Sequence, residues 1–131
     1  MIFTDTGGWF SLTVPVDPQH PAAAQWFASN RQPLFTTDFV VDETLTLLKA
    51  RGQNARAITI GRQFFSGSLA TVYYLTEEDL RAAWQVFTRY ADKEWSFTDC
   101  TSKVVMEKMG ITEAFAFDHH FRQFGTVTLV P

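Results

Sequence analysis

Two aspartates stand directly after short apolar segments that are typical of buried strands. Asp5 follows Met1–Thr4, and Asp118 follows Ala114–Phe117. In open parallel sheets, ligand sites lie just beyond the carboxyl ends of the strands. We therefore expect the two carboxylates to lie near each other if the two strands are neighbours in the sheet.

Two further acids fall on segments in which apolar residues have helical spacing. Glu43 lies three residues after Val40 and four before Leu47, so these positions share one helix face. A carboxylate on an apolar face is costly to bury unless it is paired or bound to a cation. Asp99 begins another predicted helix, where a first-turn acid also has a plain structural role at the helix dipole.

Several carboxylates at one place repel each other and raise each other's pKa values. A divalent cation removes that repulsion, and oxygen ligands suit Mg²⁺ or Mn²⁺. Such a cation can polarise a phosphoryl group, activate a water molecule or do both. The pattern predicts a metal-dependent catalytic site whose ligands are Asp5, Glu43, Asp99 and Asp118.

The elements that would position these acids alternate along the chain. Strands are predicted at Met1–Thr4, Leu34–Thr36, Leu69–Leu75, Ala114–Phe117 and Val127–Val130. Helices are predicted from about Asp38 to Lys49, from Asn54 to Phe65, after the capping-box-like Thr76–Asp79, and from about Thr98 to Met109. This alternation indicates an α/β fold with a mostly parallel sheet.

Finer features of two helices follow from local patterns. Thr13–Pro21 holds three of the five prolines and is interpreted as a loop that enters a helix, with Asp17 as its cap and Pro18 in the first helical position. In the helix predicted to begin at the cap Asn54, one side carries Ile58, Gly61 and Phe65. No linker or repeat divides the chain, so we expect one domain over residues 1–131.

Composition limits the class of protein. Of 131 residues, 46% are hydrophobic and 15% aromatic, which is enough for a core, and the net charge of −3 argues against nucleic-acid binding by bulk positive charge alone. No apolar run exceeds four residues and Met1–Gly8 has no basic residue, so we expect neither a membrane span nor a signal peptide. Cys100 is the only cysteine, and the expected location is the cytoplasm.

The motifs resemble, in order and spacing over nearly the whole chain, the PIN domain and particularly the VapC-type toxins of prokaryotic toxin–antitoxin pairs. The similar segments are Ile2–Thr6, Thr36–Leu45, Ser96–Cys100 and Gly110–Gly125. They place the family's four acids on Asp5, Glu43 (rather than the adjacent Asp42), Asp99 and Asp118. The chain departs from the family pattern at Gly7-Gly8, where a polar residue is common, and at His119-His120.

The resemblance implies a PIN-like three-layer α/β/α sandwich with a mostly parallel central sheet. It also implies a Mg²⁺- or Mn²⁺-dependent ribonuclease that hydrolyses RNA phosphodiester bonds, forms a homodimer and is inhibited by a small antitoxin protein. One or two cations would bind the four acids. Thr6 would orient Asp5 or contact the phosphate, and Arg62 and Arg122 are candidate phosphate contacts.

Other interpretations compete with this one. Asp5–Gly7 also spells the aspartic-protease triplet, but that enzyme needs an all-β fold, which the helical patterns contradict. Asp118–His120 spells part of a phosphoesterase signature that needs further histidines, and His20 is the only other one, so we expect the histidine pair at a helix start or on the surface. A catalytically silent PIN-like interaction module is the remaining alternative, and stabilisation by Mn²⁺ would discriminate against it.

Overall fold

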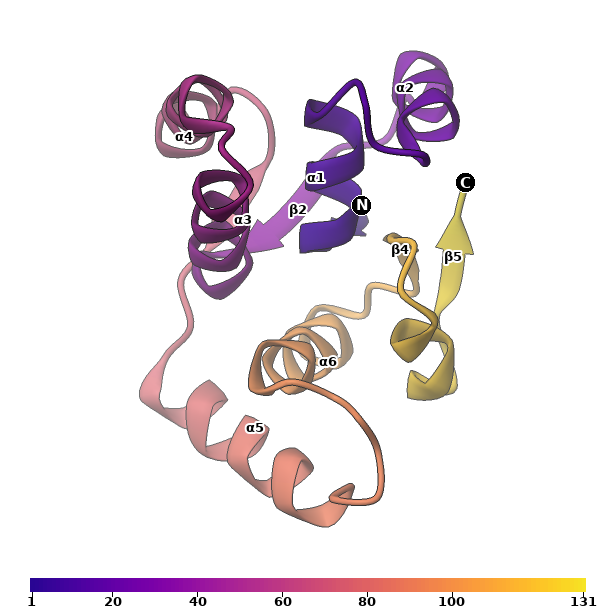
Figure 1. Ribbon diagram of the computed structural model, residues 1–131. Helices are drawn as coiled ribbons and strands as arrows, with labels where there is room; N and C mark the ends of the chain where they lie inside the picture. Colours follow the sequence, from indigo (N-terminus) through magenta and orange to yellow (C-terminus); the bar gives the residue numbers. More distant parts are fainter.

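A five-stranded parallel sheet forms the centre of the molecule (Figure 1), seen in a computed structural model that describes residues 1–131. The strands are β1 (Ile2–Thr4), β2 (Leu34–Thr37), β3 (Thr71–Tyr73), β4 (Glu113–Phe115) and β5 (Thr128–Val130). Their spatial order is β3-β2-β1-β4-β5, and every pairing is parallel. The predicted α/β fold with a parallel sheet is confirmed.

Six α-helices and one 3₁₀ helix connect the strands. They are α1 (Thr6–Thr13), α2 (His20–Ser29), α3 (Asp38–Ala50), α4 (Asn54–Ser66), α5 (Glu77–Arg89), α6 (Phe97–Met109) and the 3₁₀ helix η1 (His119–Phe124). None of them is long and apolar enough to cross a membrane.

The helices form two layers, one on each face of the sheet. Right-handed crossovers from β1 to β2 and on to β3 put α1–α4 on one face, and the return to β4 and β5 puts α5, α6 and η1 on the other. In Figure 1, α1–α4 gather in the upper half of the view, and α5 and α6 lie in the lower half. This arrangement is the expected α/β/α sandwich.

The strand order reverses between β1 and β4. The chain moves from β1 outward through β2 and β3, then returns to the other side of β1, where Phe3 pairs with Ala114 and Thr4 with Phe115. At such a reversal the connections after the two strands diverge and leave a crevice. Asp5 directly follows β1 and Asp118 lies three residues after β4, so both acids stand at this crevice.

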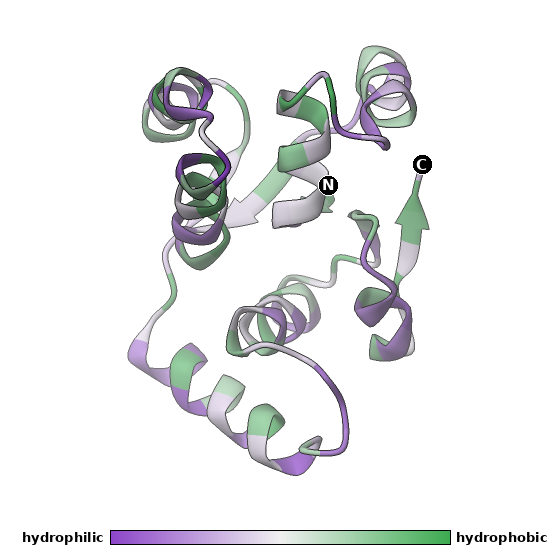
Figure 2. Ribbon diagram, in the orientation of Figure 1, coloured by the Kyte–Doolittle hydropathy of each residue, from purple (hydrophilic) through white to green (hydrophobic).

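The core holds the first helix firmly in place behind the crevice. Trp9 of α1 is fully buried, packs edge-on against the Phe64 ring and donates a hydrogen bond to Thr36 Oγ1. Figure 2 shows that β2 is hydrophobic at its start, whereas α5 alternates between hydrophilic and hydrophobic residues as a surface helix does. Asp5, one residue before α1, is therefore attached to a rigid element.

Two local predictions about helices are wrong. Asp17 does not cap α2, because that helix begins at His20, and the Asp17 side chain instead accepts a hydrogen bond from the backbone N–H of Gln19 in the preceding turn. Helix α1 is absent from the sequence prediction, since Gly7 and Gly8 both have low helix propensity. It forms because tertiary packing favours it.

Helix α4 buries only one of the three residues that the sequence analysis places on one side of it. Ile60, Gly61 and Phe64 are the buried residues of this helix, while Ile58 and Phe65 are exposed. Asn54 is the first residue of the helix rather than its cap, which is Gln53. Two large apolar side chains are thereby left in solvent.

Candidate active site

Asp5 is a buried carboxylate directly before α1. It occupies the N-cap position of α1, yet its side chain makes no capping hydrogen bond. Only 5% of the residue is exposed, and its Oδ1 atom has no hydrogen-bond partner. Leaving a buried carboxylate oxygen unsatisfied is costly, so this oxygen is available to a cation.

The charges around Asp5 show that the four predicted acids converge. The pKa of Asp5 is raised to about 8, mainly by burial and next by the negative charge of Asp99, with further contributions from the charges of Glu43 and Asp118. A hydrogen bond from the backbone N–H of Thr6 acts in the opposite direction. The fold thus collects carboxylates from four separate segments of the chain at one end of the sheet.

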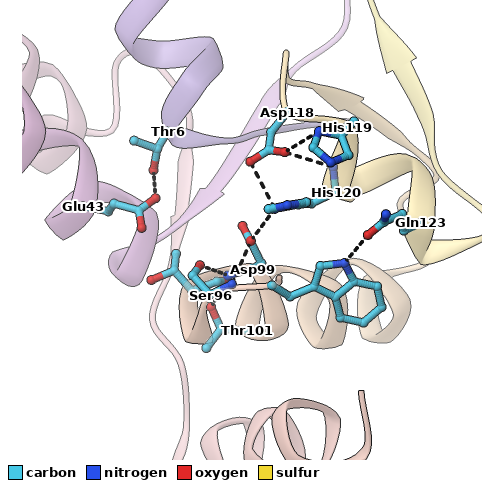
Figure 3. A network of polar contacts seen from close by, with 11 residues as sticks. Thr6, Glu43, Ser96, Asp99, Thr101, Asp118, His119, His120 and Gln123 are labelled. Carbon is cyan, nitrogen blue, oxygen red and sulfur yellow. Dashed lines mark hydrogen bonds and ion pairs between the residues drawn. The ribbon is translucent and has the colours of Figure 1, made fainter. Parts of the chain in front are cut away.

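Glu43 is held by Thr6 across two helices. Thr37, the N-cap of α3, accepts a hydrogen bond from the Val40 N–H and fixes where this helix starts. In the second turn the half-buried Glu43 accepts a hydrogen bond through Oε1 from the Thr6 hydroxyl (Figure 3). Burial raises the pKa of Glu43, the Thr6 hydrogen bond lowers it, and the charge of Asp99 raises it again. Asp42 is exposed.

Asp99 has both its structural role and a place in the site. It forms a capping box with Ser96: the Ser96 hydroxyl accepts from the Asp99 N–H, and Asp99 Oδ2 accepts from the Ser96 N–H, each at 3.0 Å. This box fixes the first turn of α6. With only 6% of the residue exposed, Asp99 lies near enough to Asp5 and Glu43 to perturb both.

Asp118 begins η1 and brings a histidine into the site. Its Oδ1 accepts a hydrogen bond from the His120 N–H at 2.9 Å. His120 Nδ1 lies 3.1 Å from Asp99 Oδ2 and 3.3 Å from Asp118 Oδ2, so the ring stands between the two carboxylates (Figure 3). The histidine pair is at a helix start as predicted. Only His119, with 73% of its side chain exposed, is a surface residue.

Sequence reasoning missed the inward orientation of His120. The signal was its position two residues after Asp118, but the contact to Asp99 is made across 21 residues and depends on η1 folding back. Arg122 is exposed on η1 and Arg62 is exposed on α4, a helix that carries none of the four acids. Burial raises the pKa of the Cys100 thiol to about 11, which suits a core residue and not a nucleophile.

The donor set fits a divalent cation. It offers carboxylate oxygens from four segments, one of them a buried oxygen with no other partner. Mg²⁺ and Mn²⁺ favour such ligands. Neutralising the converging negative charges would also relieve their mutual repulsion.

Comparison with known proteins gives results that match this geometry. A family model described as "PIN domain" matches residues 2–127. The chain is 35% identical over 131 residues to the "23S rRNA-specific endonuclease VapC20" of two Mycobacterium tuberculosis strains, covering all of this chain and 99% of the relative. It is also 35% identical to a "VapC ribonuclease" of Archaeoglobus fulgidus over 89 residues, which are 67% of this chain and 55% of that protein.

Solved structures extend the likeness to three dimensions. The crystal structure of M. tuberculosis VapC20, described as a sarcin-ricin loop cleaving toxin, superposes with a TM-score of 0.93 at 33% identity, with full coverage of both chains. The FitAcB structure from Neisseria gonorrhoeae gives a TM-score of 0.70 at 14% identity, covering 100% of this chain and 97% of that one. The second likeness concerns the fold alone.

Proposed function

Because the chain belongs to the PIN-domain family, we propose that it is an endoribonuclease and the toxin of a type II toxin–antitoxin pair. The observation that carries the proposal is the convergence of four carboxylates around the buried, unpartnered oxygen of Asp5. A protein that had kept only the shape of the fold would gain nothing from this costly arrangement. The convergence thus disfavours a catalytically silent interaction module.

The proposed substrate is ribosomal RNA. The relative that covers the full chain is named as a 23S rRNA-specific endonuclease, and its crystal structure is described as that of a sarcin-ricin loop cleaving toxin. We extend this target to the present chain. Its net charge of −3 is consistent with recognition by shape and local contacts rather than by a broad basic surface.

The proposed metal ligands are the four acids, which would hold one or two Mg²⁺ or Mn²⁺ ions. When bound, such a cation neutralises charge on the phosphodiester and lowers the pKa of a water molecule. The protein's part is positional: Thr6 fixes the carboxylate of Glu43, and the Ser96 capping box fixes that of Asp99. Arg122, exposed on η1, and Arg62 remain candidate phosphate contacts.

The proposal includes two protein partners. A small antitoxin would bind an open groove of about 580 Å³ between α1, α2 and α4, whose lining includes Leu12, Phe27 and Ile60. A second copy of the chain would cover Trp84 and Phe87, which stack on the exposed side of α5. The proposed site of action is the cytoplasm, where ribosomal RNA is available.

Cleavage of defined RNAs tests the proposal. A hairpin with the sarcin–ricin sequence, a scrambled hairpin and a single-stranded RNA are incubated with the protein in Mn²⁺, in Mg²⁺ and in chelator. Asp99→Asn runs beside the wild type to exclude contaminating ribonuclease, and the exposed Asp92→Asn is the matched control. We expect metal-dependent cutting of the sarcin–ricin hairpin that Asp99→Asn loses and Asp92→Asn keeps.

The other outcomes are equally informative. Cutting of a different RNA in the panel would keep the nuclease and reject the proposed target. If the wild type cuts nothing and Mn²⁺ does not raise its melting temperature, the catalytic proposal fails and the interaction module replaces it.

A further inference from the structure

We propose that His120 is a nitrogen ligand of the cation held by Asp99 and Asp118, so that the site binds Mn²⁺ in preference to Mg²⁺. This inference rests on the proposed function and adds a ligand of a different chemical type. On this inference, the site selects Mn²⁺ because it combines an imidazole nitrogen with carboxylate oxygens.

The positions of three donor atoms support this assignment. His120 Nδ1 lies 3.1 Å from Asp99 Oδ2 and 3.3 Å from Asp118 Oδ2. In an octahedral site with bonds of 2.0–2.1 Å, adjacent ligand atoms stand about 3.0 Å apart. The nitrogen is therefore about as far from each of the two oxygens as neighbouring ligands of one ion are from each other.

The imidazole is held in this place by its own helix. The His120 backbone N–H donates to Asp118 Oδ1, and the next residue, Phe121, is fully buried and packs against Phe3 of β1. Phe124 anchors the end of the same turn in the core. Only 15% of the His120 side chain is exposed. A rotamer held in this way is the arrangement expected of a ligand rather than of a solvated surface residue.

The other two histidines do not share this environment. His119 Nδ1 is 3.7 Å from Asp118 Oδ1, and most of its side chain is in solvent. His20 lies on α2, where its Nδ1 is within hydrogen-bond distance of the Ser11 carbonyl oxygen. His119 is thus a natural control, because it neighbours the site in sequence without contacting Asp99.

The same Nδ1 position would also suit a simple hydrogen bond to the two carboxylates. The two roles have different consequences for metal choice. Imidazole nitrogen is a good ligand for transition metals, whereas Mg²⁺ prefers oxygen. A nitrogen ligand therefore contributes mainly to Mn²⁺ affinity, while a residue that only orients the carboxylates contributes to both metals alike.

The experiment measures metal binding without RNA, on protein from which any histidine tag has been removed. Mn²⁺ and Mg²⁺ affinities are measured by calorimetry for the wild type, His120→Asn and His119→Asn. Pulsed electron paramagnetic resonance of the Mn²⁺-loaded proteins then detects ¹⁴N coupling from a bound imidazole. Asn places an amide near the position of Nδ1, so it keeps a hydrogen-bond donor but removes the imidazole nitrogen.

We expect ¹⁴N coupling in the wild type and in His119→Asn but not in His120→Asn. Mn²⁺ affinity should fall about tenfold or more in His120→Asn, with a change of less than about threefold for Mg²⁺. Wild-type protein that binds Mn²⁺ without ¹⁴N coupling, or equal losses for the two metals, overturns the inference and leaves the proposed nuclease intact. A wild type that binds neither metal overturns both.

Discussion

Gly8 lies directly against the backbone carbonyl of Phe115. A Cβ atom at position 8 would stand 2.5 Å from that oxygen, whereas a Cβ atom at Gly7 would meet nothing within 4 Å. Helix α1 therefore approaches β4 as closely as a backbone can. The contact sets how closely α1, which directly follows Asp5, packs against the end of β4.

Alanine at these two neighbouring positions should act in opposite directions. Gly8→Ala forces α1 away from β4, and we expect it to lower the free energy of unfolding by about 1–3 kcal/mol, as overpacking does. Gly7→Ala only removes a glycine from a helix and should raise that free energy by about 0.5–1 kcal/mol. Urea unfolding of both variants measures the difference. Equal changes in the free energy of unfolding for the two variants would show that stability does not depend on the close approach of α1 to β4.

The network around Asp79 predicts a pH dependence of stability. Burial alone would raise the pKa of Asp79, but hydrogen bonds from the Thr76 backbone N–H, the Tyr73 hydroxyl and the Lys108 ammonium lower it to about 2. The unfolded chain has the ordinary value of about 3.9. Because the folded pKa is the lower one, the stabilisation is complete above about pH 4 and is lost as the pH falls toward 2.

Asp79→Asn should therefore lower the free energy of unfolding by about 2 kcal/mol at pH 7. The difference from wild type should shrink as unfolding is measured at successively lower pH between 4 and 2. Glu78→Gln is the matched control. Glu78 is exposed, and its substitution removes one charge from the same first turn of α5. A constant difference at all pH values would contradict the assignment.

The hydroxyl of Thr6 should matter for catalysis through Glu43. Thr6→Val keeps the branched shape but removes the hydrogen bond to Glu43 Oε1, and we expect RNA cleavage to fall about 10- to 100-fold, as for other residues that orient metal ligands. Thr6→Ser restores the hydroxyl and should restore most of the rate. Single-turnover cleavage measures both. If Thr6→Val and Thr6→Ser reduce the cleavage rate equally, the loss does not come from the missing hydroxyl.

Asp5 should destabilise the folded protein in the absence of metal. We expect Asp5→Asn to raise the melting temperature in chelator, since a buried carboxylate with an unpartnered oxygen is removed. In Mn²⁺ the order should reverse, because wild type gains about 2.7 kcal/mol at 100 times the Kd while the variant gains little. The exposed Asp42→Asn serves as control. A variant that Mn²⁺ stabilises as much as wild type would remove Asp5 from the ligand set.

The aromatic pair on α5 should control the oligomeric state. Trp84 is 54% exposed and stacks on Phe87. If a second copy covers this pair, Trp84→Ser should weaken the dimer by about 2 kcal/mol or more, which is roughly 30-fold in Kd. Sedimentation velocity measures the shift toward monomer, with the adjacent Gln85→Ser as control. A monomeric wild type would reject the proposed dimer surface.

The elements and the four acids were accessible from the sequence because their signals are local. Helices α3, α5 and α6 have apolar residues at helical spacing, β2 begins with a short apolar run, and the boxes at Thr76 and Ser96 mark helix starts. The positions of Asp5 and Asp118 after apolar strands predicted their meeting at one edge of the sheet. These features depend on patterns a few residues long.

The features that escaped prediction depend on contacts between distant segments. Helix α1 exists because Trp9 is buried and Gly8 fits against β4, neither of which is visible in the helix-breaking pair Gly7-Gly8. His120 was expected at a helix start or on the surface, and only the fold-back of η1 turns its side chain toward Asp99. Tertiary packing overrode local propensity in both places.

The pairing of β1 with β4 also sets when the protein can become active during its synthesis. Phe3 pairs with Ala114, more than a hundred residues later in the chain, and Asp118 follows that pairing. A growing chain that ends before β4 lacks both the neighbouring strand and the fourth carboxylate. Domains generally fold as units as they emerge, so a ribosome making this protein would release no partial nuclease. The proposed activity arises in one step, when the last segment of the site docks.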